Sequence, residues 1–123
     1  MGEALKKEEI VFETVEVSEE AQKFDDLKAP LGLVPSSAMI EEALVMGFGE
    51  KKYGRDNWRQ GMAWSRLIDA ALRHIHAFND GEDFDRETGY HHLAHARCCL
   101  AFLIEYYTTH PEKDDRHGSQ AGK

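Results

Sequence analysis

The feature that most constrains this fold is a long apolar run that stops shortly before Pro111. Residues 91–108 have the three- and four-residue spacing of a helix, and proline cannot continue it. A helix that is apolar on most of its circumference needs partners on several sides. The run therefore predicts a central helix, either within an all-α bundle or in an oligomer interface. Its apolar positions are Leu93, Ala96, Leu100, Leu103, Ile104 and Tyr107, with Cys99 and Phe102 on a second stripe.

Two further helices are predicted before this run. Residues 65–79 place apolar side chains at helical spacing, with Ser65 as the expected N-cap. Residues 37–48 form the other helix, which Gly47 and Gly49 are expected to end or to fit against a neighbour. Residues 51–61 have no helical period and predict an ordered loop. The expected fold is a compact bundle of three main helices with an extended N-terminal arm or short strand.

The charge distribution divides the chain into three parts. Residues 1–27 carry nine acids and three lysines and predict an acidic arm, with a β-capable stretch at residues 10–17. Residues 28–110 carry eleven acids and nine bases and form the predicted helical domain. Residues 111–123 are polar and predict a flexible tail.

The composition also excludes several classes of function. The helical domain has no long basic stripe, which argues against general nucleic-acid binding. There is no signal-like segment and no apolar run of about 20 residues, so we expect a cytoplasmic protein without a membrane span. Cys98 and Cys99 are adjacent in an apolar helical run and cannot form a disulfide framework.

Two histidines one helical turn apart are the strongest candidates for metal or phosphate binding in the sequence. His92 and His95 share one helix face, and the acidic residues between Asp80 and Glu87 directly precede them. Flanking glycines would let this loop fold back toward the helix N-terminus. His74 lies on a small-residue face of the second helix that can approach the third. Each feature also has an ordinary structural explanation, namely packed histidines and a solvated acidic loop.

A metal site built from these residues would not be an EF-hand. Counting from Asp83, the twelfth position is Ala94, where the calcium loop requires a glutamate. A mixed set of carboxylates and imidazoles instead suits Mg²⁺ or Mn²⁺, with imidazole favouring Mn²⁺ or Zn²⁺. Glu42 on the first helix could also reach inward.

Several separated motifs occur in order along the chain, namely Leu33-Val34-Pro35, residues 48–58 (FGEKKYGRDNW), Arg73-His74, residues 81–89 (GEDFDRETG) and residues 92–96 (HLAHA). Together they resemble the phage and prophage family described as the dATP/dGTP diphosphohydrolase N-terminal domain. The resemblance runs from about Lys23 to Tyr106. The family name implies hydrolysis of a purine deoxynucleoside triphosphate to the monophosphate and pyrophosphate, a reaction shared with the distantly similar MazG-like all-α pyrophosphohydrolases.

The sequence departs from the MazG-like pattern of paired carboxylates. Those enzymes hold Mg²⁺ with an ExxE and a later ExxD motif. Here Glu42 has Met39 and Val45 at the partner positions, and the third helix carries His92 and His95 instead. Either a rearranged set holds the metal, namely Glu42 with Glu82, Asp85 and the histidines, or the site binds a nucleotide without cleaving it.

The leading hypothesis is metal-dependent pyrophosphohydrolysis of purine deoxynucleotides. One alternative is a noncatalytic phage protein that sequesters a nucleotide or nucleotide signal, and another is a structural oligomerisation module. The central apolar helix predicts a homo-oligomer in any case. The proposed roles are catalysis by Glu82, Asp85 and His74, phosphate contacts by Lys52, Arg55 and Arg73, base or sugar contacts by Tyr53, Asn57 and Trp58, and metal binding by Glu42, Asp85, His92 and His95.

Overall fold

Three α-helices dominate the computed structural model, which describes residues 28–119. The predicted arm or strand within residues 1–27 lies outside the described residues. The part of the chain that is described contains no strand, and one isolated antiparallel bridge joins Phe84 to His91. The all-α prediction is confirmed. The elements are η1 (Leu31–Leu33), α2 (Ser36–Tyr53), η2 (Asn57–Gln60), α3 (Trp64–Asn79), α4 (His92–Thr109) and η3 (Pro111–Lys113).

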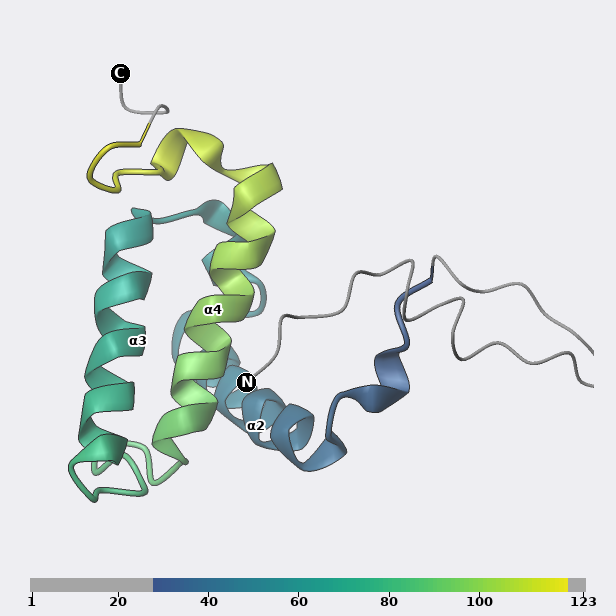
Figure 1. Cartoon of the computed structure of the whole chain (residues 1–123), viewed down its shortest axis with the longest axis vertical. Coiled ribbons are helices and arrows are strands. Elements are labelled where there is room, and N and C mark those ends of the chain that lie inside the picture. Colours follow the sequence, from purple (N-terminus) through teal and green to yellow (C-terminus); the bar gives the residue numbers. More distant parts are fainter. Residues whose placement is uncertain (1–27, 120–123) are drawn as a thin grey trace, which may run out of the picture. The chain divides into compact units, whose positions relative to one another are not determined.

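The apolar helix α4 lies between the other two, as its sequence predicts. It runs antiparallel to α3 along most of its length and also packs on α2 (Figure 1). The short turn η1 belongs to a separate unit that ends at Leu33. No helix among residues 28–119 is long and apolar enough to cross a membrane.

Helix α2 is longer than the sequence predicts. The expected end at Gly47 and Gly49 is wrong, because the helix continues to Tyr53 and absorbs the first residues of the predicted loop. Lys51 and Lys52 lie in its last turn, where positive charge is favourable. Gly54 ends it with φ of 93° and donates its N–H to the Glu50 carbonyl at 2.8 Å.

The N-terminus of α3 is held from a distant part of the chain. Ser65 is not the N-cap, since the helix begins at Trp64 and Ala63 occupies that position. The Asp115 carboxylate instead accepts hydrogen bonds from the Ser65 N–H at 2.9 Å and from its hydroxyl at 2.6 Å. Part of the predicted flexible tail is therefore folded against α3, because its carboxylate satisfies a helix N-terminus.

The core consists of two clusters joined by Phe102 of α4. One lies between α2 and α4 around Val45, Ala94 and Cys98. The other lies between α3 and α4 around Trp64, Leu67 and Tyr106. Tyr106 is completely buried, and its hydroxyl donates to the Trp58 carbonyl. The aromatic residues thus close one end of the α3–α4 pair, whereas the opposite end is lined by polar groups.

Candidate functional site

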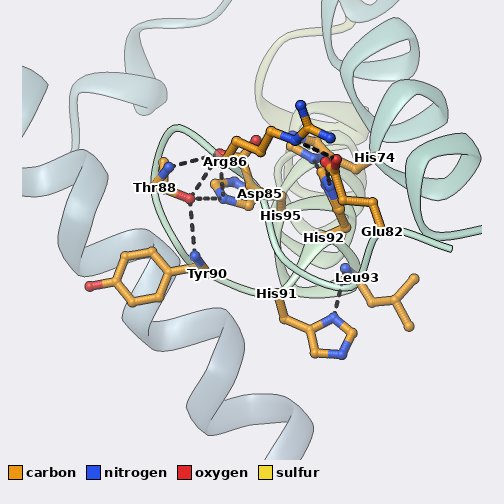
Figure 2. A network of polar contacts seen from close by, with 10 residues as sticks. All are labelled: His74, Glu82, Asp85, Arg86, Thr88, Tyr90, His91, His92, Leu93 and His95. Carbon is orange, nitrogen blue, oxygen red and sulfur yellow. Dashed lines mark hydrogen bonds and ion pairs between the residues drawn. The ribbon is translucent and has the colours of Figure 1, made fainter.

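The loop between α3 and α4 folds back over the first turn of α4. Gly81 and Gly89 adopt positive φ angles of 101° and 78°, which other residues rarely adopt. The Asp85 N–H donates to the Tyr90 carbonyl at 2.8 Å, and the His92 N–H donates to the Asp83 carbonyl at 3.0 Å. The side chains of Glu82 and Asp85 are thereby brought beside His74, His92 and His95 of the two helices (Figure 2).

A chain of hydrogen bonds links His74 of α3 to the loop through His92 of α4. The Nδ1 atoms of the two histidines are 2.9 Å apart, and His92 Nε2 lies 2.7 Å from Glu82 Oε1. The other Glu82 oxygen accepts from Arg86 Nε at 2.9 Å. With neutral His92 donating from Nε2 to the carboxylate, its Nδ1 holds the lone pair and accepts from His74 Nδ1. Glu82 therefore fixes the tautomer of His92.

A second chain orients His95. The Thr88 hydroxyl donates to Asp85 Oδ2 at 2.9 Å and lies 2.7 Å from His95 Nε2. Because the single hydroxyl proton goes to Asp85, His95 must donate from Nε2 to the Thr88 oxygen, which leaves the lone pair of neutral His95 on Nδ1. The His95 ring also stacks on His74, with centroids 4.4 Å apart and planes 7° from parallel.

The electrostatics of the cluster favour the neutral form of His74 and His95 and the charged form of Glu82 and Asp85. Burial lowers the pKa of His74, and the rings of His95 and His92 lower it further. Burial also lowers the pKa of His95, although Asp85 opposes this. Burial would raise the pKa of Asp85, but the hydrogen bonds from Thr88 outweigh it, so the pKa lies below its usual value. The hydrogen bond from His92 lowers the pKa of Glu82. Neutral imidazole and ionised carboxylate are the metal-binding forms.

Three side chains of the cluster are placed to hold a cation together. One ligand atom each from His74, Asp85 and His92 lies within 4.8 Å of the others. A cation bound by both histidines would replace the hydrogen bond between their Nδ1 atoms. This donor set fits a divalent metal, and its two imidazoles favour Mn²⁺ or Zn²⁺ over Mg²⁺.

The cluster forms one wall of a cavity of about 550 Å³, a volume typical of small-molecule sites. The opposite wall comes from the second half of α2, including Phe48, Lys52 and Tyr53. Arg73 of α3 adds a second positively charged side chain to that of Lys52. Lys52 Nζ lies 3.6 Å from Glu87 of the loop, an exposed ion pair at the rim. The cavity thus combines two cations, an acidic loop and the histidine cluster.

The structure brings only some of the predicted site residues together. His74, Asp85, His92, His95, Lys52, Tyr53 and Arg73 line the cavity, and Glu82 stands behind His92. Glu42 does not line the cavity, because its carboxylate accepts from Arg97 Nε at 2.9 Å. Arg55 pairs with Glu50 at 3.7 Å and also lies outside the lining.

Trp58 packs at the end of the α3–α4 pair that aromatic residues close, and Asn57 directly precedes it. The Trp58 ring stacks on Phe102 with centroids 4.3 Å apart, and Asn57 begins the turn η2. Neither residue lines the cavity. In place of the expected base or sugar contact, Trp58 packs against the core cluster around Trp64 and Tyr106.

Thr88 is the site residue that sequence reasoning missed. A threonine inside an acidic loop belongs neither to a helical hydrophobic pattern nor to a known metal-ligand motif, so neither pattern identifies it as a site residue. The available signal is its spacing from Asp85, since an aspartate side chain often accepts the N–H of a nearby residue in a turn. The Thr88 N–H indeed donates to Asp85 Oδ2 at 3.0 Å.

The fold and the site define a small helical domain with a histidine–carboxylate cluster beside a cationic cavity. Comparison with known proteins identifies it further: the chain belongs to the family described as dATP/dGTP diphosphohydrolase, N-terminal, whose model matches residues 18–116. A protein of Salmonella phage PMBT28 named dATP/dGTP diphosphohydrolase is 46% identical over 99 residues. The match covers 80% of this chain and 34% of the relative, so the chain spans about a third of the relative's length. No solved structure matches the chain.

Proposed function

We propose that this domain hydrolyses purine deoxynucleoside triphosphates, dATP or dGTP, to the monophosphate and pyrophosphate with the aid of a divalent cation. The observation that carries the proposal is the 550 Å³ cavity, whose wall joins Lys52 and Arg73 to the cluster of His74, Asp85 and His92. The description of the family and the name of the phage relative support the choice of reaction and substrate.

Lys52 and Arg73 are suited to bind the triphosphate. Lys52 already pairs with the exposed Glu87 carboxylate at 3.6 Å, and a phosphate oxygen can take that carboxylate's place. Arg73 supplies a planar guanidinium for a second phosphate on the α3 side. Tyr53, at the end of α2, is placed to contact the base or sugar at the rim of the cavity.

The cation would be held by His74, Asp85 and His92, and Mn²⁺ is the metal that best combines these ligands with phosphate oxygens. When bound, it would polarise a phosphoryl oxygen as a Lewis acid. Glu82 acts as a positioning residue for His92, because both of its oxygens are engaged. His95 is placed to accept the proton of the attacking water at Nδ1, with Thr88 and Asp85 orienting the ring from Nε2.

The second candidate is nucleotide binding without cleavage. The carboxylates of Glu82 and Asp85 are already engaged, Glu82 by His92 and Arg86 and Asp85 by Thr88. In addition, the matched region is about a third of the phage relative, so that protein has a large further part. A noncatalytic domain would use the same cavity to capture the nucleotide.

Pyrophosphate release from each of the four deoxynucleoside triphosphates, with Mn²⁺ or Mg²⁺, separates these two functions. We expect turnover of dATP or dGTP with Mn²⁺ that falls at least about 100-fold in Asp85→Asn, because loss of an outer-shell partner of a metal ligand alone costs about 10- to 100-fold. Asp83→Asn is the matched control, because Asp83 is an exposed acid of the same loop outside the cavity. Calorimetric binding without turnover would favour the second candidate, and neither binding nor turnover would contradict both.

A further inference from the structure

The outer surface of the α3–α4 pair carries an apolar face that the described residues leave uncovered. On α4, Leu100, Ile104 and Tyr107 are 47%, 76% and 71% exposed, and the helical spacing places them with Leu93 on one stripe. On the neighbouring α3, Leu72 and Ile75 are 47% and 41% exposed. These six side chains define what we term the α3–α4 apolar face.

This face is separate from the proposed nucleotide cavity. His95 and Phe102 lie on the opposite side of α4 from Leu93 and Leu100, by the 100° rotation per residue of a helix. None of the six residues of the α3–α4 apolar face lines the cavity. A partner on this face would therefore leave the cavity open.

The face is too large and too apolar to be a scattering of single exposed side chains. Its six large residues expose together several hundred Å², comparable with the roughly 800 Å² that each partner buries in a standard interface. A hollow of about 330 Å³ at one end, between Ile68, Ile104 and Tyr107, offers room for side chains of a partner. Contiguous apolar patches of this size mark interaction sites.

We infer that the α3–α4 apolar face binds the same face of a second copy of this chain, so that two α3–α4 pairs form a four-helix bundle. A second copy fits because the six residues of the face carry no charge, and Arg97, which the helical spacing places between Leu93 and Leu100, pairs with Glu42 of α2 at 2.9 Å. Such a surface complements itself, whereas binding a charged partner would require opposite charges on the face. The exposed area approaches what each partner buries in a standard interface, and paired helical hairpins pack in this way.

The experiment is light scattering of the full chain over a dilution series, for the wild type, Leu72→Glu and Leu100→Glu. We expect the wild type to have twice the mass of the chain at micromolar concentration and to dissociate on dilution. Each glutamate should raise the dimer dissociation constant by at least about 100-fold, because each dimer would bury two unpaired charges. Both substituted positions are about half exposed in the single chain, so the variants should keep its helical circular dichroism and melting behaviour.

Ala43→Glu is the matched control, since it adds the same charge at an exposed position of α2 and should leave the dimer intact. A wild type with the mass of one chain at all concentrations would overturn the inference. This result would mean that another segment or a different protein covers the face. A dimer that survives both Leu72→Glu and Leu100→Glu would also overturn it.

Discussion

The two ends of the α3–α4 pair are built from the same helices and yet are filled in opposite ways. At one end, Trp64, Tyr106 and the Trp58–Phe102 stack occupy the space between the elements. At the other end, His74 and His92 face a cavity of about 550 Å³. Aromatic packing at the first end stabilises the bundle, which allows the second end to keep a hollow lined with polar groups. Substitutions at each end test this division between an aromatic end and a histidine end.

The largest expected effect is the loss of Tyr106 at the aromatic end. Tyr106→Ala removes a completely buried ring and should lower the free energy of unfolding by about 3–5 kcal/mol. Tyr106→Phe keeps the ring and removes only the hydroxyl that donates to the Trp58 carbonyl, so the expected loss is about 1–2 kcal/mol. Urea unfolding measures both. Equal losses of unfolding free energy in the two variants would show that the buried ring does not stabilise the fold through its packing.

A substitution of Gly61 tests how closely the chain packs against the His110 ring at the aromatic end. Its φ is 94°, and an added Cβ would lie 2.8 Å from His110 Nδ1. Gly61→Ala should therefore cost about 1–3 kcal/mol in backbone strain together with a displacement of the His110 ring. Gly54→Ala is the matched control, because its φ is 93° and nothing lies within 4 Å of the added Cβ. Urea unfolding should show the larger loss for Gly61→Ala, and equal losses would contradict the close contact.

Substitutions of Thr88 test the hydrogen bonds of the histidine end without a change in packing. Thr88→Val keeps the shape but removes the hydroxyl that joins Asp85 to His95, so Mn²⁺ affinity should fall about 10- to 100-fold. Thr88→Ser keeps the hydroxyl and should bind Mn²⁺ nearly as well as the wild type. Titration calorimetry measures both affinities. Equal losses for valine and serine would show that the methyl group matters rather than the hydrogen bonds.

The smallest expected effect is a pH dependence of stability at the aromatic end. The Arg59 carbonyl, followed by Glu112, raises the pKa of His110 above its usual value of 6.5. Since the folded-state pKa is the higher one, this stabilisation is complete below about pH 6.5 and is lost as the pH rises through the folded-state value. The melting temperature should therefore decline slightly over that range, and less so in His110→Gln. The same decline in both proteins would rule out His110 as its source.

Local sequence signals predicted the elements, and the long-range contacts had to come from the structure. The period of residues 65–79 and the glycines around the acidic loop were sufficient to bring His74 near His92. The extension of α2 to Tyr53 could not be predicted, because Gly47 and Gly49 are weak helix formers and context overrode them. The pairing of Glu42 with Arg97 and of Ser65 with Asp115 joins residues about 50 positions apart. No local pattern encodes such contacts.

We propose that the histidine end binds a metal and a purine deoxynucleotide, and a pair of α3 variants provides the sharpest test. His74→Ala removes a ligand of the cluster, whereas His76→Ala removes an exposed histidine two residues away, outside the cavity lining. The measurement is Mn²⁺-dependent binding of dATP and dGTP by calorimetry. We predict that His74→Ala loses binding and that His76→Ala retains it. Equal affinity in both variants and the wild type would contradict the account.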